Sequence, residues 1–228
     1  MKAISVVFAL VLSSAAWAGE TRPVVVELFT SQGCSSCPPA DRLLGELAKR
    51  GDVVALGFHI TYWDGAAWRD PLSRQQSTDR QIAYDRGLTG GQVYTPQMII
   101  DGTTDVVGSD RTAVLAALDN AKPKGVAPVH FAADGKSVAI GAGAAPATAR
   151  VLLARYVLSR TTHVGGGENA SRTAIDTNAV AALTTLGAWS GSAARFPIDP
   201  PGDGEGLAVL VQAADGRMLG AAALQPSG

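Results

Sequence analysis

The sequence is poor in cysteine, in net charge and in long apolar runs. It has two cysteines among 228 residues, which excludes a small domain held together by several disulfides. Its net charge is -1, with acids and bases mixed along the chain, so no basic surface for nucleic acid or an anionic membrane is expected. Past the first residues, no apolar run reaches the ~20 residues of a spanning helix. We therefore expect no nucleic-acid partner and no membrane span after processing.

The first 18 residues have the features of a secretory signal peptide. Lys2 supplies a positive start, residues 4–12 form an apolar run, and Ala-Trp-Ala at 16–18 is a small-x-small cleavage pattern. Because the apolar run is shorter than the ~20 residues of a membrane anchor, cleavage is expected. The sequence thus predicts a chain that begins near Gly19 and is periplasmic or secreted.

The rest of the chain divides into two halves with different patterns. In 19–122, apolar strands at 23–30, 53–60 and 97–100, a return strand at 105–108, and helices at 37–50, 73–86 and 110–120 give the order β-α-β-α-β-β-α with a mixed sheet. A Lys, Pro and Gly cluster at 121–125 predicts a linker. In 126–228, short apolar strands alternate with glycine-rich turns, which predicts a mainly antiparallel β-sandwich domain. Strands are expected at 126–132, 137–141, 150–159, 206–213 and 217–224, whereas 173–186 fits either strand or helix.

Both cysteines lie in the motif Cys34-Ser35-Ser36-Cys37, after a buried strand and at a helix start. The loop between them is too short to constrain the unfolded chain much, so a purely structural disulfide is a poor explanation. At or just before a helix start, Cys34 would have its pKa lowered to roughly 3.5 to 7.5 by unpaired amides and the helix dipole. We expect Cys34 to attack a disulfide and the less exposed Cys37 to release the product.

A metal site is the competing interpretation of the same residues. Two thiolates are half of a zinc site, but the chain has no second cysteine pair and its three histidines are scattered. A copper site formed by Cys34, Cys37 and His59 stays open, because soft sulfur with imidazole suits that metal.

The chain direction of the predicted strands brings other residues to the cysteine pair. Two parallel strands are expected to end at residues 30 and 60, and an antiparallel strand to start after Pro96. These two strand ends and this strand start therefore lie on one edge of the sheet. Cys34, residues 59–64 and Thr95-Pro96 should therefore converge, with His59, Tyr62, Trp63 and Asp64 as a substrate-binding rim. Trp63 could equally be a packing anchor. In the second half, Glu168 and Asn169 in a glycine-rich loop are expected to be a solvated turn.

The segments VELFTSQGCSSCPPAD and YTPQMIIDG carry a resemblance to a known fold. Residues 23–122 resemble the thioredoxin superfamily, and the chain looks like an uncharacterised family of secreted bacterial thioredoxin-like proteins. The resemblance implies a thioredoxin-like domain in which Pro96 is cis beside the disulfide and Thr95 presents backbone groups to an extended peptide. Glu27, an acid in an apolar strand, needs a partner, a raised pKa or an exposed edge. The resemblance also implies that Glu27 helps to move the proton of the resolving thiol, although its spacing to Cys34 is one residue longer than in thioredoxins.

The sequence as a whole favours a periplasmic thiol-disulfide oxidoreductase that exchanges disulfides with protein or small-molecule thiols. No organic cofactor is needed for that chemistry. The alternative is a non-catalytic binding module that holds a partner protein or copper. The direction of the reaction, the substrate, the role of the second half and the oligomeric state are left open.

Overall fold

The computed structural model describes residues 22–88, 90–121, 126–145 and 147–225. The predicted signal peptide at 1–18 and residues 122–125 of the predicted linker lie outside the described residues. No helix within the described ranges is both long and apolar enough to cross a membrane.

The first half contains the predicted elements in the predicted order. They are β1 (Val24–Thr30), α1 (Pro38–Leu47), β2 (Val53–His59), α2 (Gln75–Leu88), β3 (Gln97–Ile100), β4 (Thr104–Val107) and α3 (Arg111–Asn120). Strands β1 and β2 are buried throughout and pair in parallel, while β3 runs antiparallel to β1. Pro38 and Pro39 open α1, where the missing amide donors cost nothing. Asp110 caps α3 as its side chain accepts a hydrogen bond from the Ala113 amide.

The second half is mainly antiparallel, as its pattern predicted, but its strands do not form a separate sandwich domain. Its strands are β5 (Val129–Phe131), β6 (Ser137–Ile140), β7 (Ala149–His163), β8 (Thr173–Trp189), β9 (Ala194–Pro197), β10 (Glu205–Gln212) and β11 (Met218–Leu224). Four of them continue the first sheet in the order β11-β10-β7-β8-β2-β1-β3-β4, and β5, β6 and β9 form a second, three-stranded sheet. The two halves therefore share one mixed sheet.

The junction between the halves is the parallel contact of β2 with β8, at Gly57 opposite Ala179. A Cβ at Gly57 would lie 3.2 Å from the carbonyl oxygen of Thr177, so glycine permits the close approach of the two backbones. The side-chain amide of Asn178 donates to the carbonyl oxygen of Ala55 at 2.9 Å and fixes the register. The pairing of β2 with β8 joins residues that are far apart in the sequence, so no local sequence pattern predicts it.

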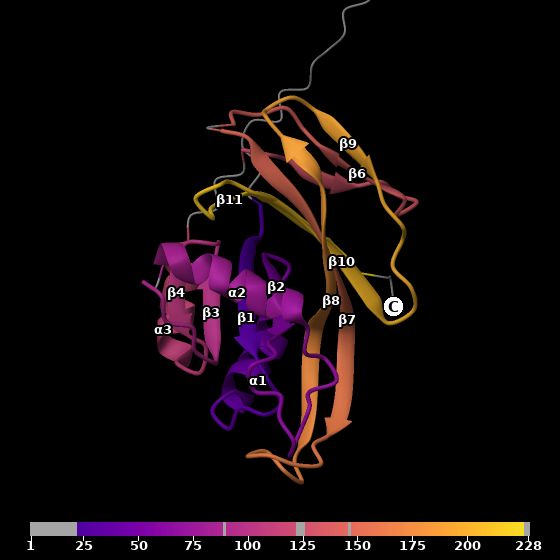
Figure 1. Ribbon diagram of the computed structural model, residues 1–228. Helices are drawn as coiled ribbons and strands as arrows, with labels where there is room; N and C mark the ends of the chain where they lie inside the picture. The colour runs from indigo at the N-terminus through magenta and orange to yellow at the C-terminus, as the bar shows by residue number, and fades with distance from the viewer. Residues whose placement is uncertain (1–21, 89, 122–125, 146, 226–228) are drawn as a thin grey trace, which may run out of the picture.

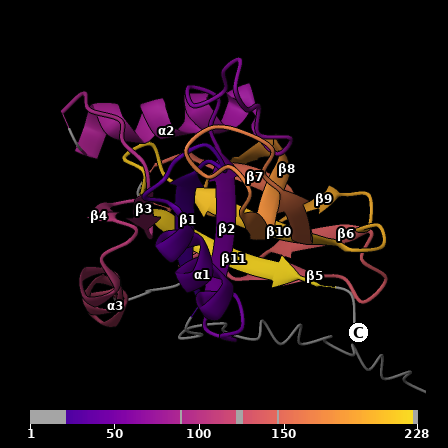
Figure 2. The ribbon, with the colours of Figure 1, turned by 90° about the horizontal axis from the view of Figure 1, so that it is seen from below.

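Helices and the small sheet cover both faces of the large sheet. Figure 2 shows α2 on one face and α1 with α3 on the other. Alternation along β1 sorts the side chains, since Val25 and Phe29 belong to the core under α2 whereas Val26 and Leu28 belong to the core under α1. The three-stranded sheet packs on β7, β10 and β11 around Trp189.

Strands β7 and β8 form a long hairpin that links the two ends of the molecule (Figure 1). It starts beside the three-stranded sheet and runs past β2 to the edge at which β1 and β2 end. Register shifts near Val151 and Arg155 interrupt the pairing of the two strands. The loop that connects them, residues 164–172, thus lies next to the turn that contains the cysteines.

Candidate functional site

The cysteine motif forms a disulfide in the turn between β1 and α1. The Cα atoms of Cys34 and Cys37 are 5.4 Å apart. The turn is held by the Cys34 amide, which donates to Ser31 at 3.1 Å, and by the Cys37 amide, which donates to Cys34 at 3.2 Å. Helix α1 begins at Pro38 with Cys37 as its N-cap, so Cys37, not Cys34, directly precedes the helix.

The predicted convergence at the sheet edge is confirmed for the residues around Pro96. The Thr95-Pro96 peptide bond is cis. The hydroxyl of Ser36 donates to the carbonyl oxygen of Thr95 at 3.4 Å, and the indole N–H of Trp63 donates to the Thr95 hydroxyl at 2.8 Å. Thus Thr95 contacts both the cysteine turn and the loop after β2.

The expectation that Cys34 is exposed is wrong, because both cysteines are 0% exposed. The loop 164–172, expected to be a solvated turn, covers the cysteine turn. The side-chain amide of Asn169 donates to the carbonyl oxygens of Cys34 at 2.8 Å and Gln32 at 2.9 Å. The carboxylate of Glu168 accepts a hydrogen bond from the Ser35 amide at 3.3 Å. We call residues 164–172 the capping loop.

Glycine lets the capping loop pack tightly against the loop after β2. A Cβ at Gly166 would lie 1.9 Å from the carbonyl oxygen of Ala67, and one at Gly165 would lie 3.2 Å from the ring of Trp68. On the cysteine side, a Cβ at Gly33 would lie 3.4 Å from the Cβ of Trp63. The disulfide is therefore enclosed by two loops whose glycines allow this contact.

The predicted rim residues have different environments. Tyr62 and Trp63 are exposed at this edge, at 44% and 38%. Asp64 braces its own loop by accepting hydrogen bonds from the Asp70 amide and the Ser73 hydroxyl. His59 is 3% exposed and lies beneath the loop, so it is not a rim residue.

His59 belongs to a buried cluster of charged groups on the α1 face. Its Nδ1 lies 2.7 Å from a carboxylate oxygen of Asp70, and its Nε2 lies 3.7 Å from one of Asp176. Burial acts to lower the pKa of His59, but the hydrogen bond and charge of Asp70, with the charges of Asp176 and Asp41, raise it to about 9. At neutral pH, His59 is thus an imidazolium. We call Asp41, His59, Asp70 and Asp176 the histidine cluster.

The copper set of Cys34, Cys37 and His59 does not converge in this arrangement. Both ring nitrogens of His59 face carboxylates, and the two sulfurs are bonded to each other. Within the part of the chain that the structure describes, no group of three or more His, Cys, Asp or Glu side chains is arranged to hold a metal ion.

Asp41 connects the histidine cluster to the cysteine motif, and sequence reasoning missed it. It lies one helical turn after Cys37, and its amide donates to the Cys37 carbonyl oxygen at 3.1 Å. Its half-buried carboxylate accepts a hydrogen bond from the Thr30 hydroxyl at 2.7 Å. Burial raises the pKa of Asp41 to about 7, against the Thr30 hydrogen bond and the charge of His59. The sequence did contain a signal for Asp41, because it is an acid four residues after Cys37 and three before the buried Leu44. Residues at these spacings are neighbours on the surface of a helix.

Glu27 has the partner that the sequence predicted, but it faces away from the cysteine turn. Both carboxylate oxygens bind the guanidinium of Arg80, and one accepts a hydrogen bond from the Tyr84 hydroxyl at 2.6 Å. Alternation along β1 directs Glu27 toward α2 and Thr30 toward α1. The geometry therefore makes Glu27 a paired core charge and gives no support to its predicted part in proton transfer.

One protein-family model matches the chain, and two solved structures are similar to it. A protein-family model described as "Protein of unknown function (DUF1223)" matches residues 25–212. The X-ray crystal structure of a protein from Agrobacterium tumefaciens is similar over 92% of this chain and 98% of that chain, with 34% sequence identity and a TM-score of 0.78. HBP35 of Porphyromonas gingivalis is similar over 90% of this chain and 76% of that chain, with a TM-score of 0.58 and 13% identity, so the likeness concerns the fold alone. No curated protein matches the chain.

Proposed function

Because the chain belongs to the DUF1223 family, whose description names no activity, we propose a function from its own site: thiol-disulfide exchange in the periplasm or outside the cell. The observation that carries this proposal is a two-residue-spaced disulfide beside a cis proline at the carboxyl edge of a mixed sheet. The same observation, with the element order of the first half, supports a thioredoxin-like identity for residues 23–122. The signal-peptide pattern at 1–18 supports the compartment.

The reaction moves two electrons between the cysteine pair and a substrate. In the reduced protein, the Cys34 thiolate attacks a substrate disulfide, an S–S bond forms to one substrate sulfur, and the other leaves as a thiolate that takes up a proton. The Cys37 thiolate then attacks the Sγ atom of Cys34, restores the Cys34–Cys37 disulfide and releases the second substrate sulfur as a thiol. The substrate disulfide is reduced and the cysteine pair is oxidised. The reverse sequence oxidises two substrate thiols.

In this proposal Asp41 accepts the proton of Cys37 in the second step. It lies one turn along the helix from Cys37, and its pKa of about 7, raised by burial, gives it a partly ionised carboxylate at neutral pH. Asp41 thus has the proton-transfer role that the resemblance to thioredoxins implies for Glu27. Because it takes the proton from the reacting thiol, Asp41 is the general base of this step in the proposal.

Exchange requires the cover over the disulfide to open. Both sulfur-bearing residues are 0% exposed, and the Asn169 amide and the Trp63 side chain lie against the cysteine turn. Two hydrogen bonds from Asn169 hold the capping loop, and each contributes roughly 0.5 to 1.5 kcal/mol. A cover of this strength opens readily compared with global unfolding.

The test is exchange between the reduced protein and glutathione disulfide, followed by mass spectrometry under native conditions. We expect the parent to return to the intramolecular disulfide, Cys37→Ser to accumulate a stable glutathione adduct on Cys34, and Cys34→Ser to lose the exchange. Ser35→Ala, an exposed position in the same turn, is the matched control and should behave as the parent. If the folded parent forms neither the adduct nor the disulfide, the proposal is wrong.

A second candidate is a binding protein in which the disulfide is only structural, and the complete burial of both cysteines favours it. Reduction of the oxidised parent by dithiothreitol separates the two functions. An exchange enzyme should be reduced without unfolding, whereas a structural disulfide should react only at the rate of unfolding, as followed by far-ultraviolet circular dichroism.

A further inference from the structure

An exposed apolar surface lies beside the cysteine turn, on two segments that meet at Thr95. Among the described residues, six large apolar side chains are exposed, and three of them lie here: Tyr62 at 44%, Trp63 at 38% and Val93 at 39%. We call these three residues the apolar patch. None of them packs in one of the apolar cores that the structure describes, so their exposure indicates contact with a partner.

Both aromatic side chains of the apolar patch are held by their polar ends. The indole N–H of Trp63 donates to the Thr95 hydroxyl at 2.8 Å. Burial raises the pKa of the Tyr62 hydroxyl, against its hydrogen bonds with the side chains of Gln81 and Thr95. Rings that are already held in this way lose little further conformational freedom when a partner binds, which favours a binding role.

The apolar patch adjoins the sulfur that attacks in the proposed exchange. The Sγ atom of Cys34 lies 3.4 Å from the hydroxyl oxygen of Ser36, and that hydroxyl donates to the carbonyl oxygen of Thr95 at 3.4 Å. Each residue of an extended chain spans at most ~3.6 Å. A polypeptide whose sulfur reaches Cys34 can therefore place a neighbouring side chain against Tyr62 and Trp63.

The segments that form this surface carry no charge. Residues 35–36, 61–63 and 91–95 contain no Asp, Glu, Lys, Arg or His. Glutathione has two carboxylates, and these segments offer neither of them a cation. The carboxylate of Glu168, which accepts a hydrogen bond from the Ser35 amide at 3.3 Å, adds a negative charge beside the turn. Charge and exposed apolar area together favour a neutral apolar stretch of polypeptide over a small anionic thiol.

We propose that the substrates of the cysteine pair are unfolded polypeptides that carry a large apolar side chain next to the reacting cysteine. The apolar patch holds this side chain against the rings of Tyr62 and Trp63, with Val93 beside them, while the substrate sulfur reaches Cys34. The inference rests on the proposed disulfide exchange and names the substrate class of that site.

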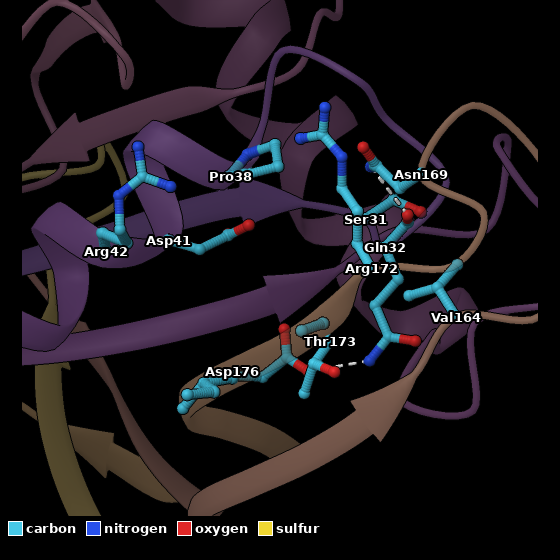
Figure 3. Close-up of a pocket in the computed structure, with 12 residues that line it drawn as sticks. Ser31, Gln32, Pro38, Asp41, Arg42, Val164, Asn169, Arg172, Thr173 and Asp176 are labelled. Atoms are coloured by element: carbon cyan, nitrogen blue, oxygen red, sulfur yellow. Dashed lines mark hydrogen bonds between the residues drawn. The ribbon is translucent and has the colours of Figure 1, made fainter.

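A separate pocket of about 370 Å³, between α1 and the start of β8, is the rival site for an apolar side chain. Figure 3 shows Pro38 and Asp41 on the α1 side of this pocket, and Thr173 and Asp176 on the β8 side. Its wall includes Ile175, which is 63% exposed, but no residue of the apolar patch and neither cysteine. Four of its twelve lining residues are charged, so we assign the substrate side chain to the apolar patch.

Exchange between the reduced protein and two glutathionylated peptides tests the proposal. The peptides are blocked at both ends and differ only at the two residues beside their single cysteine, which are phenylalanine in one peptide and serine in the other. Quenched-flow mass spectrometry gives the rate of reduction of each peptide, and division by its rate with dithiothreitol removes the intrinsic reactivity of its disulfide. On this scale the parent should reduce the phenylalanine peptide about tenfold faster, because the patch buries part of an aromatic side chain.

Variants of Tyr62 assign this preference to the apolar patch. Tyr62→Ser removes one ring and should lower the preference to about threefold or less, whereas Tyr62→Phe keeps the ring and should retain it. Ile175→Ser removes an exposed aliphatic side chain from the rival pocket, and as the matched control it should leave the preference unchanged. A preference that falls in Ile175→Ser and not in Tyr62→Ser would place the substrate side chain in the pocket and overturn the proposal.

The substrate class and disulfide exchange itself fail in different ways. Equal normalised rates for the two peptides in the parent would overturn the substrate class and leave disulfide exchange standing. If the parent reduces neither peptide and does not react with glutathione disulfide, disulfide exchange is wrong and the substrate class falls with it.

Discussion

Two buried charged clusters lie on opposite faces of the same sheet, and they are built differently. On the α2 face, Glu27 is bound through both oxygens to Arg80, with Tyr84 and Gln212 completing the hydrogen bonds. On the α1 face, the histidine cluster has three carboxyl groups around one imidazolium. The first cluster pairs its charges one to one, and the second does not.

The difference between the clusters separates a structural role from a functional one. In the glutamate cluster the Glu27 carboxylate is matched by the Arg80 guanidinium. In the histidine cluster burial raises the pKa of Asp41 to about 7. The histidine cluster also adjoins the cysteine turn, because Asp70 accepts a hydrogen bond from the Gln32 amide at 2.9 Å.

Removing the cation of the glutamate cluster should cost the most stability. Arg80→Met leaves Glu27 buried and without its cation, and we expect a loss of about 3 to 5 kcal/mol in the free energy of unfolding. Urea denaturation at pH 7 measures it. Arg86→Met, an exposed position on the same helix, is the control and should change stability by less than about 0.5 kcal/mol. Equal stability of the two variants would show that the pair is not a structural element.

The histidine cluster should make stability depend on pH. The pKa of His59 is raised from 6.5 to about 9 in the folded protein by Asp70, Asp176 and Asp41, against burial. Its stabilising contribution is therefore complete below pH 6.5 and is lost as the pH rises through about 9, a loss of about 3 kcal/mol. Urea denaturation between pH 7 and 9.5 measures the slope.

Asp70→Asn is the variant that assigns this slope to His59. Without the Asp70 charge, the pKa of His59 should fall, so that the loss of stability over the same pH range is less than half that of the parent. Arg80→Met serves as the comparison from the other face, and it should lower the whole curve without removing the slope. A slope that persists in Asp70→Asn would contradict the assignment.

These clusters also show what local sequence can and cannot predict. Glu27 was recognisable because an acid in an apolar strand needs a partner, but Arg80 lies 53 positions away and no local pattern names it. The elements of the first half followed from apolar periodicity and from Pro38, Pro39 and Asp110 at helix starts.

The histidine cluster could not be predicted from local sequence, because its members come from separate segments that only the fold brings together. Asp176 lies in β8, whose register shifts break the strand period and left the segment 173–186 undecided between strand and helix. The pairing of β8 with β2, which places Asp176 beside His59, joins Gly57 to Ala179 over a long sequence separation. The cover formed by Asn169 depends on the same pairing, and so the burial of Cys34 was missed.

Asp41→Asn should change the rate of exchange by a smaller amount. If Asp41 accepts the proton of Cys37, the release of glutathione from the mixed disulfide should slow about tenfold at pH 8, equivalent to about 1.4 kcal/mol. The parent rate should rise with an inflection near pH 7, where Asp41 ionises, and the variant should lack that inflection. Quenched-flow alkylation with mass spectrometry measures the rate. Glu27→Gln is the comparison, and an inflection lost there instead would return the proton role to Glu27.

The smallest effect is expected at the capping loop. Asn169→Ala removes the two hydrogen bonds to the carbonyl oxygens of Gln32 and Cys34, so the cover should open more often and dithiothreitol should reduce the disulfide about fivefold faster. Alkylation of the released thiols at fixed times gives this rate. Arg172→Ala, in the same loop and exposed, retains both hydrogen bonds and should react as the parent. If Asn169→Ala is reduced no faster than this control, the cover does not limit access, and the enclosed disulfide must be reached from the side of Trp63 and Thr95.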